Sequence, residues 1–373
     1  MKFDIQSLGV IYALLETEGI GPQRIINLLK SFASPLDLLS TSSNLLSQLE
    51  GFNQILARKI IESLDKINHY TNEFSNQLEE TEKQGIKLLT YWDDDYPKNL
   101  KNIFYPPIFL YYKGELRKSD EIAVAIVGTR TPSNYGKEIS KEFAAAIAKS
   151  HVTIISGMAR GIDSIAHKAT LDAGGRTIAV IGSGLDVIYP PENEKLFNQI
   201  IESGCVISEF KLGTQPDAKN FPQRNRIISG LSKGIVIIET KIIGGAIQTA
   251  NHALDQGREV YAIPGNIHSI NSEGTNFLIQ QGNAQLVLSP NEILRDLKID
   301  VSSESTEKRK TIFEGLTLFE QKIIDVLTDK QLQIDQIAEQ TKLSVSECLV
   351  SLLNLEFKGY IRQLPGKYFE IIY

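Results

Sequence analysis

Residues 152–169, with the sequence VTIISGMARGIDSIAHKA, constrain the fold more than any other stretch of the chain. The stretch begins with four β-branched residues, a pattern typical of a buried strand. Gly157 and Gly161 then permit a turn, and the apolar residues that follow recur at helical spacing. A strand, a glycine turn and a helix bring free backbone N–H groups and a helix dipole to one point, which favours an anion site. The same pattern is also typical of an ordinary tight connection in an α/β sheet.

Five further apolar runs of strand length accompany the first, and helical patterns separate most of them. Together the six runs occupy residues 122–127, 152–155, 177–181, 205–208, 235–238 and 260–263. This alternation predicts a doubly wound, mostly parallel α/β sheet, Rossmann-like and extended, with helices on both faces. More strands are expected at 87–91 and 285–288, and residues 105–114 should lead into a strand at the edge. Because such sheets bind ligands at the carboxyl ends of their strands, we expect the functional residues there.

The length of 373 residues predicts more than one domain. Residues 1–66 are expected to form a small helical domain of the SAM-like or helix-hairpin-helix type, because Gly19-Ile-Gly-Pro22 leads into an amphipathic helix. That turn could hold a DNA phosphate through its amides, or it could only pack a helical bundle. Residues 67–295 contain the predicted sheet domain, and residues 296–311 have the polar composition of a linker.

Residues 312–373 are predicted to form a winged-helix domain. Three helical patterns are followed by two short strands around Pro365-Gly366. Ser344 is expected to cap the third helix, at residues 344–358. That helix contains few Lys and Arg residues, so contact with a protein fits it at least as well as reading of a DNA groove.

Composition describes an ordinary globular protein that needs no metal and no membrane. Cys205 and Cys348 lie far apart without partners at metal-ligand spacing, which fits a reducing cytoplasm. The adjacent carboxylates Asp93, Asp94 and Asp95 cannot all point the same way, so they predict a turn and not a metal site. No apolar run is long enough to span a bilayer, and no signal segment is recognised, so we expect a cytoplasmic protein. The net charge of −6 still allows a local basic groove for nucleic acid.

Two enzymatic interpretations fit the sequence poorly. Gly182-Ser-Gly184 begins like a dinucleotide fingerprint, but Val187 stands where the third glycine belongs, so no nucleotide cofactor is expected. Ser156, Asp163 and His167 contain the residue types of a hydrolytic triad. Asp163 and His167 are four residues apart on one predicted helix, however, so we expect them to pair with each other or to cap the turn.

Residues 218–233 are the most informative stretch after the first. They contain no acidic residue and four basic ones, Lys219, Arg224, Arg226 and Lys233. Arginine binds phosphate with paired donors, and an exposed Phe221 would offer a face on which an unpaired base can stack. Pro222 predicts that Phe221 lies in an extended segment. The alternative is a helix start with Phe221 buried and the arginines solvated or paired with Glu209 or Glu239.

Several ordered motifs closely resemble the DNA-processing protein A (DprA/Smf) family over about residues 87–288. They are Val127-Gly-Thr-Arg130, SGMARGID at residues 156–163 together with His167, the run 182–193, Ser208-Glu209, FPQRNRIISGLS at residues 221–232 and GREVYAIPG at residues 257–265. The resemblance implies a bacterial cytoplasmic protein of natural transformation. It implies binding of incoming single-stranded DNA, a homodimer built on the sheet domain, and loading of the RecA recombinase. No catalytic turnover and no cofactor are expected.

The DNA pocket of that family corresponds to nine positions of this chain. They are Gly128, Arg130, Gly157, Arg160, Lys219, Phe221, Arg224, Arg226 and Arg258. One departure is Gly244-Gly-Ala-Ile-Gln-Thr249, where the family commonly has Ser-Gly-Ser-Leu-Ile-Thr, so that Gln248 alters the surface of the loop.

The rival function class is a Rossmann-type hydrolase related to the nucleoside monophosphate phosphoribohydrolases. Those enzymes use a Gly-Gly-x-Gly-Thr loop followed shortly by a glutamate. Here Gly244-Gly245 is followed by Ala-Ile-Gln-Thr-Ala-Asn-His, which lacks both the middle glycine and the glutamate. A third class, a pure protein-interaction scaffold, would leave the acid-free arginine stretch unexplained.

Overall fold

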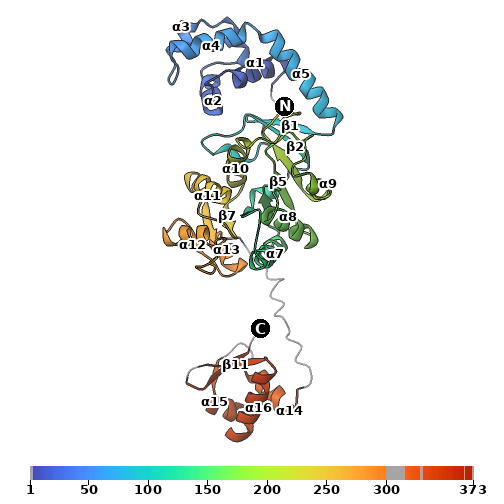
Figure 1. Cartoon of the computed structure of the whole chain (residues 1–373), viewed down its shortest axis with the longest axis vertical. Coiled ribbons are helices and arrows are strands. Elements are labelled where there is room, and N and C mark those ends of the chain that lie inside the picture. The colour runs from blue at the N-terminus through green and yellow to red at the C-terminus, as the bar shows by residue number, and fades with distance from the viewer. Residues whose placement is uncertain (1–2, 300–315, 328–330, 365, 372–373) are drawn as a thin grey trace. The chain divides into compact units, whose positions relative to one another are not determined.

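The computed structural model describes residues 3–299, 316–327, 331–364 and 366–371. The chain forms two compact units, Met1–Asp300 and Val301–Tyr373, which are described separately (Figure 1). Within the described residues, no helix combines the length and the apolar character needed to cross a membrane.

The first unit contains a nine-stranded sheet of order β1-β2-β6-β5-β4-β3-β7-β8-β9. Its strands are β1 (Lys87–Thr90), β2 (Phe109–Gly114), β3 (Ala123–Val127), β4 (Thr153–Ser156), β5 (Thr177–Val180), β6 (Cys205–Ser208), β7 (Gly234–Ile237), β8 (Glu259–Ala262) and β9 (Gln285–Leu286). Neighbouring strands from β6 to β9 are parallel, which confirms the predicted fold class. The expectation of an edge strand after residue 105 is wrong, because β2 pairs antiparallel with both β1 and β6 and leaves β1 at the edge.

Helices cover both faces because the central strands bury side chains on both sides. Val124 and Ile126 of β3 enter one core and Ala125 and Val127 the other, as the period of two requires. The first face carries α7 (Asn134–Lys149), α8 (Ile162–Asp172), α9 (Glu194–Ser203) and α13 (Pro290–Asp296). The second carries α6 (Lys98–Lys101), α10 (Asn220–Leu231), α11 (Gly245–Asp255) and α12 (Glu273–Gln280). Figure 1 shows α8 and α9 on one side of the strands and α10 and α11 on the other.

The amino-terminal helices share a hydrophobic core with the sheet. They are α1 (Ile5–Glu16), α2 (Pro22–Lys30), α3 (Ser43–Ser47), α4 (Gln54–Leu64) and α5 (Ile67–Lys83). Phe74 of α5 packs on Phe109 of β2 with ring centroids 4.9 Å apart. Lys211 Nζ donates to Tyr12 Oη at 2.7 Å and to Glu73 Oε1 at 3.0 Å. These contacts explain why the helices belong to the same unit as the sheet, while a domain boundary at residue 66 stays a prediction.

The second unit has its own core and the winged-helix arrangement. Its elements are α14 (Leu318–Leu327), β10 (Leu332–Gln333), α15 (Ile334–Thr341), α16 (Val345–Phe357), β11 (Ile361–Leu364) and β12 (Tyr368–Ile371), with sheet order β10-β12-β11. Ser344 caps α16 as predicted, accepting a bond from Glu347 N at 3.3 Å. The predicted turn residue Pro365 and residues 300–311 of the predicted linker lie outside the described residues.

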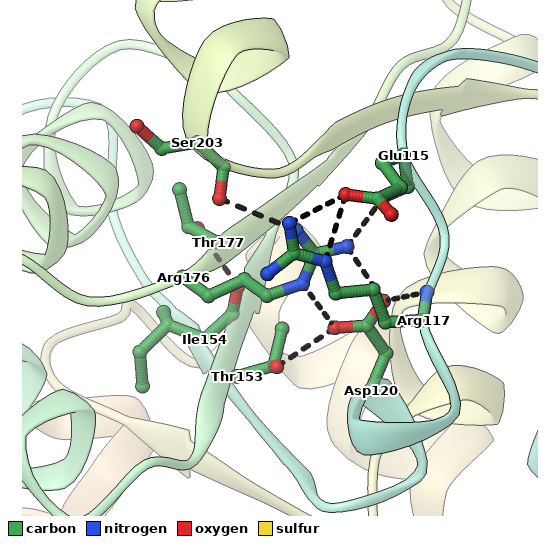
Figure 2. Close-up of polar contacts among 8 residues, drawn as sticks. All are labelled: Glu115, Arg117, Asp120, Thr153, Ile154, Arg176, Thr177 and Ser203. Carbon is green, nitrogen blue, oxygen red and sulfur yellow. Dashed lines mark hydrogen bonds and ion pairs between the residues drawn. The ribbon is translucent and has the colours of Figure 1, made fainter.

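A network of hydrogen bonds and ion pairs connects residues at the amino edge of the sheet (Figure 2). The largely buried Arg176 donates to Asp120 Oδ1 at 2.6 Å and to the Ser203 carbonyl at 3.3 Å. Thr153 Oγ1 also donates to Asp120 Oδ1, at 2.9 Å. Arg117, which pairs with Glu115, adds a backbone N–H bond to Asp120 at 2.8 Å. Because these groups satisfy one another, the network is structural, and the opposite, carboxyl edge is the place to look for function.

Candidate nucleic-acid interface

A cleft of about 700 Å³ opens at the carboxyl edge of the sheet. It lies between the loops that follow β3 and β7, whose helices α7 and α11 cover opposite faces. This divergence is the topological switch point at which doubly wound sheets bind ligands. The loop after β4 and the first turns of α10 and α11 complete the walls, and Gly244, Gly245 and Gln248 lie among the lining residues.

The glycine turn before α8 is packed against the rest of the protein. Gly161 has φ +80°, and a Cβ there would lie 2.4 Å from the Thr129 carbonyl oxygen. A Cβ on Gly157 would lie 2.1 Å from Arg224 Nη1, and one on Gly128 would lie 2.7 Å from Ile162 Cγ1. Glycine is therefore required at these positions by close approach inside the protein, and a DNA contact by Gly128 or Gly157 stays a prediction.

The anion that this turn holds is a carboxylate of the chain itself. Asp163 lies in the first turn of α8, where the helix dipole favours a negative charge. Its Oδ2 accepts the Gly157 N–H at 3.1 Å. Burial raises the pKa of Asp163, an effect that the charge of Arg224 opposes. The Gly157 amide is therefore not free to bind a DNA phosphate.

Arg224 is a largely buried cation among the residues that line the cleft, with 4% of its surface exposed. Its Nη1 donates to the carbonyl oxygens of Gly157 and Val180. Burial lowers the pKa of Arg224 to about 10, which leaves it charged at neutral pH. The structure thus places Arg224 in the protein interior beside Asp163, where it holds the β4 and β5 loops together.

Of the two expectations for Asp163 and His167, pairing with each other is wrong, whereas capping of the turn is confirmed for Asp163. His167 is fully buried, and its Nδ1 lies 2.6 Å from Thr177 Oγ1. Ser156 Oγ donates to the Ile126 carbonyl at 2.6 Å. Ser156 also shares a side-chain hydrogen bond with Asp163, but the ring of His167 is bonded to Thr177 and to the backbone of Ser156, and burial lowers the pKa of His167 to about 3. This arrangement suits packing and not nucleophilic catalysis.

Phe221 presents an aromatic face at the mouth of the cleft. It is half-buried and lies in the first turn of α10, so the expectation of an extended segment is wrong. Pro222 is tolerated there because the first turn of a helix needs no N–H donor at that position. The Phe221 ring lies 5.8 Å from the ring of Tyr189 and 5.3 Å from Arg130 Cζ. Gly182 leaves room for the ring, since a Cβ there would approach it to 3.1 Å.

Exposed cations surround this aromatic face. Arg130 is exposed, and Arg160 is exposed while it pairs with Glu192. Lys219 is exposed and lies 3.9 Å from Asp217, next to the cleft residue Ala218. Lys241 lines the opposite wall. These side chains can each reach a phosphate at little cost because they remain in water.

The structure separates two predicted residues from the cleft. Arg226 donates to Glu209 at 2.6 Å and is largely buried, which is the structural alternative that the sequence left open. Arg258 precedes β8 and therefore lies at the amino edge, where its Nη2 donates to the Asn99 carbonyl at 2.9 Å. Arg226 and Arg258 could contact DNA in the cleft only if their side chains left these partners, so their assignment to the DNA site stays a prediction.

Sequence reasoning missed two residues of the cleft. Lys241 follows strand β7, and its position after a strand end is a signal that could have identified it. Tyr189 belongs to an irregular loop between β5 and α9, and no local pattern marks it as a neighbour of Phe221.

Models of known families match most of the chain. Residues 87–298 match DNA recombination-mediator protein A, residues 314–367 the DprA winged helix domain, and residues 11–66 a SAM-like helix-hairpin-helix tandem. Protein Smf of Synechocystis is 33% identical over 95% of this chain and 96% of its own. Protein Smf of Escherichia coli is 39% identical over 78% of this chain and 79% of its own.

Solved structures agree with this match. The crystal structure of DNA processing protein A from Streptococcus pneumoniae has a TM-score of 0.64 at 33% identity, covering 79% of this chain and 99% of that one. A structure of the Helicobacter pylori protein, which describes its single-stranded DNA binding mode, has a TM-score of 0.52 at 30% identity, covering 57% and 95%. The chain therefore belongs to the DNA recombination-mediator protein A (DprA/Smf) family.

Proposed function

We propose that this chain binds single-stranded DNA in the cleft at the carboxyl edge, protects incoming DNA during natural transformation and loads the RecA recombinase onto it. The observation that carries the DNA part is the Phe221 ring, flanked by Tyr189 and the exposed Arg130 at the mouth of the cleft. The family's description as a recombination mediator and the DNA-binding mode described for the Helicobacter pylori relative support the wider role.

The chemistry of the cleft favours single strands over duplex. A partly exposed aromatic ring can stack on a base whose own partner is absent, and this contact tolerates any base. Arg130, Lys219 and Lys241 supply charges that attract phosphates without reading the sequence. We therefore expect binding without base specificity.

Phe221→Ala is expected to weaken single-strand binding by about 1–3 kcal/mol, because it removes one stacking face. The parent protein should show a slope of roughly −2 in log affinity against log salt if about three phosphates are neutralised, and the variant should keep that slope. Titration of labelled single strands and duplex at several salt concentrations measures both quantities.

Phe104→Ala is the matched control, because Phe104 is 69% exposed and does not line the cleft. It should bind like the parent. Tighter binding of the parent to duplex, or a salt-independent affinity, would contradict the proposed site. An unchanged affinity of Phe221→Ala would move the base contact elsewhere.

We also propose that the chain forms a homodimer through the β9 edge of the sheet. β9 is the last strand of the sheet and presents a short unpaired edge. Phe277, Leu286 and Leu288 are exposed around it, at 38%, 42% and 71%. A second copy of the same edge would cover these apolar side chains and satisfy the backbone groups of the strand.

Deleting residues 300–373 is expected to leave both the dimer and the single-strand affinity unchanged. The α16 helix exposes Val345, Leu349, Leu353 and Phe357 at i, i+4 spacing, a face suited to protein contact and not to a DNA groove. Sedimentation of the truncated protein tests the assembly. If the truncated protein is a monomer, the proposed dimer interface at the β9 edge is wrong. Leu288→Asp places a charge in that interface and should convert the full-length protein to monomers.

A further inference from the structure

A groove of about 530 Å³ runs between α7 and α8 on the first face of the sheet. We propose that this groove binds the sugar-phosphate backbone of the DNA strand that leaves the cleft. The proposal rests on the proposed function, because it requires a single strand to be held at Phe221.

The groove carries an excess of unpaired positive charge. Lys141 and Lys149 of α7 and Lys168 of α8 line it, and all three side chains are exposed. Among the described residues, none of the three has an ion pair, and Asp172 is the one acidic residue of the lining. In a chain of net charge −6, such a local excess of cations is typical of a binding site for a polyanion.

The walls of the groove leave space for a backbone strand. Ala145, Ala169 and Ala173 form much of the lining, and the bulkiest apolar residue there, Ile165, is itself partly buried. A protein interface of useful affinity needs large apolar or aromatic anchors at its centre, which these alanines do not provide. Lysines above a shallow alanine floor instead match a phosphate backbone, whose binding is dominated by charge.

The helices that form the groove begin next to the cleft. α7 and α8 both begin at the carboxyl edge, and Ile162 N in the first turn of α8 donates to the carbonyl of Thr129, a cleft residue in the loop before α7, at 3.2 Å. Arg130 and Arg160, both exposed, stand in the two loops that precede these helices. Both arginines line a pocket together with Phe221, so the proposed path runs from Phe221 past these arginines to the lysines. The 16 residues of α7 give the path a length of about 24 Å, enough for several nucleotides.

The ordinary role of these lysines would be helix solvation. Lys149 lies in the last turn of α7, where a cation also stabilises the helix dipole. If the lysines only solvate the helices, their removal should affect the affinity for short and long DNA equally. If they line a DNA site, their removal should weaken binding of long DNA alone. DNA length is therefore the variable that separates the two roles.

The test compares Lys141→Ala/Lys149→Ala/Lys168→Ala with the parent on single strands of about six and about twenty nucleotides. With the long strand, the slope of the parent should be about two units steeper than the value of roughly −2 expected for the cleft alone, since each single-strand phosphate contact contributes about 0.7. The triple variant should lose those two units and about tenfold or more in affinity. With the short strand, which the cleft alone can hold, the affinity should not change.

Two controls make the result specific. Lys87→Ala/Lys118→Ala/Lys233→Ala removes the same charge from exposed lysines at the amino edge and should bind both strands like the parent. Replacing the three groove lysines with arginine should restore binding of the long strand. An unchanged long-strand affinity, or an equal loss on both strands, would overturn the groove site. Failure of the parent to bind either strand would instead overturn the proposed function.

Discussion

Arg224→Ala is expected to lower the free energy of unfolding by about 3–5 kcal/mol. The side chain is buried, and it crosslinks the β4 and β5 loops through the carbonyls of Gly157 and Val180. Its removal would leave those carbonyls without their donor and the buried carboxylate of Asp163 without its neighbouring positive charge. Chemical or thermal unfolding of the parent and the variant measures the difference.

Arg130→Ala is the matched comparison, because this arginine is exposed to solvent over the Phe221 ring and is not buried as Arg224 is. It should change stability by less than about 0.5 kcal/mol while it weakens single-strand binding and lowers the salt slope by about 0.7. If Arg224→Ala instead melts like the parent and merely binds DNA less well, then Arg224 is an exposed phosphate contact and not a buried crosslink.

The contrast between these two arginines shows where sequence reasoning stops. Both belong to motifs of the sheet domain, and the sequence predicts phosphate contact for both. Their different surroundings depend on residues far away in the chain, because Gly157 is 67 positions from Arg224 and its missing side chain is what admits the guanidinium. No local pattern around residue 224 contains that information.

The sheet itself was predictable because its signal is local. Runs of β-branched residues of strand length, separated by helical periodicity, identify β3 to β8 within a residue or two. The position of β2 in the sheet was not predictable, because the sequence around residue 109 does not show whether one or two strands will pair with it. The first turn of α10 was missed because Pro222 fits both an extended segment and a helix start.

Spacing along a helix left two possibilities open for Asp163 and His167, pairing with each other or capping of the turn, and it did not identify Thr177 as the partner of His167. Asp163 and His167 are one turn apart, as a helical pair requires, yet both are buried and find partners outside the helix. Asp163 binds the Gly157 amide and His167 contacts Thr177. Partners supplied by tertiary packing therefore replaced the local pair, and they left His167 in a site that disfavours its charged form.

Acidification is expected to destabilise the protein through His167. Burial lowers the pKa of His167 to about 3 in the folded state, against 6.5 for an exposed histidine. Below pH 6.5 the unfolded chain takes up a proton that the folded protein cannot, so stability falls as pH falls, by about 1.4 kcal/mol for each unit down to about pH 3. Between pH 7.5 and 5 this gives a loss of about 2 kcal/mol, which denaturant unfolding at each pH would measure.

His167→Gln isolates this contribution, because glutamine keeps a polar group near Thr177 and does not titrate. Its stability at pH 7.5 can differ from that of the parent, but its loss between pH 7.5 and 5 should be smaller by about 2 kcal/mol. Burial also lowers the pKa of His252, which acts in the same direction and remains in both proteins, so it cancels in the comparison. The raised pKa of Asp163 acts in the opposite sense, since the folded state then binds a proton more tightly than the unfolded chain, and it too remains in both. Equal pH dependence in the two proteins would mean that His167 takes up a proton without unfolding the site, and the buried neutral imidazole inferred from the structure would be wrong.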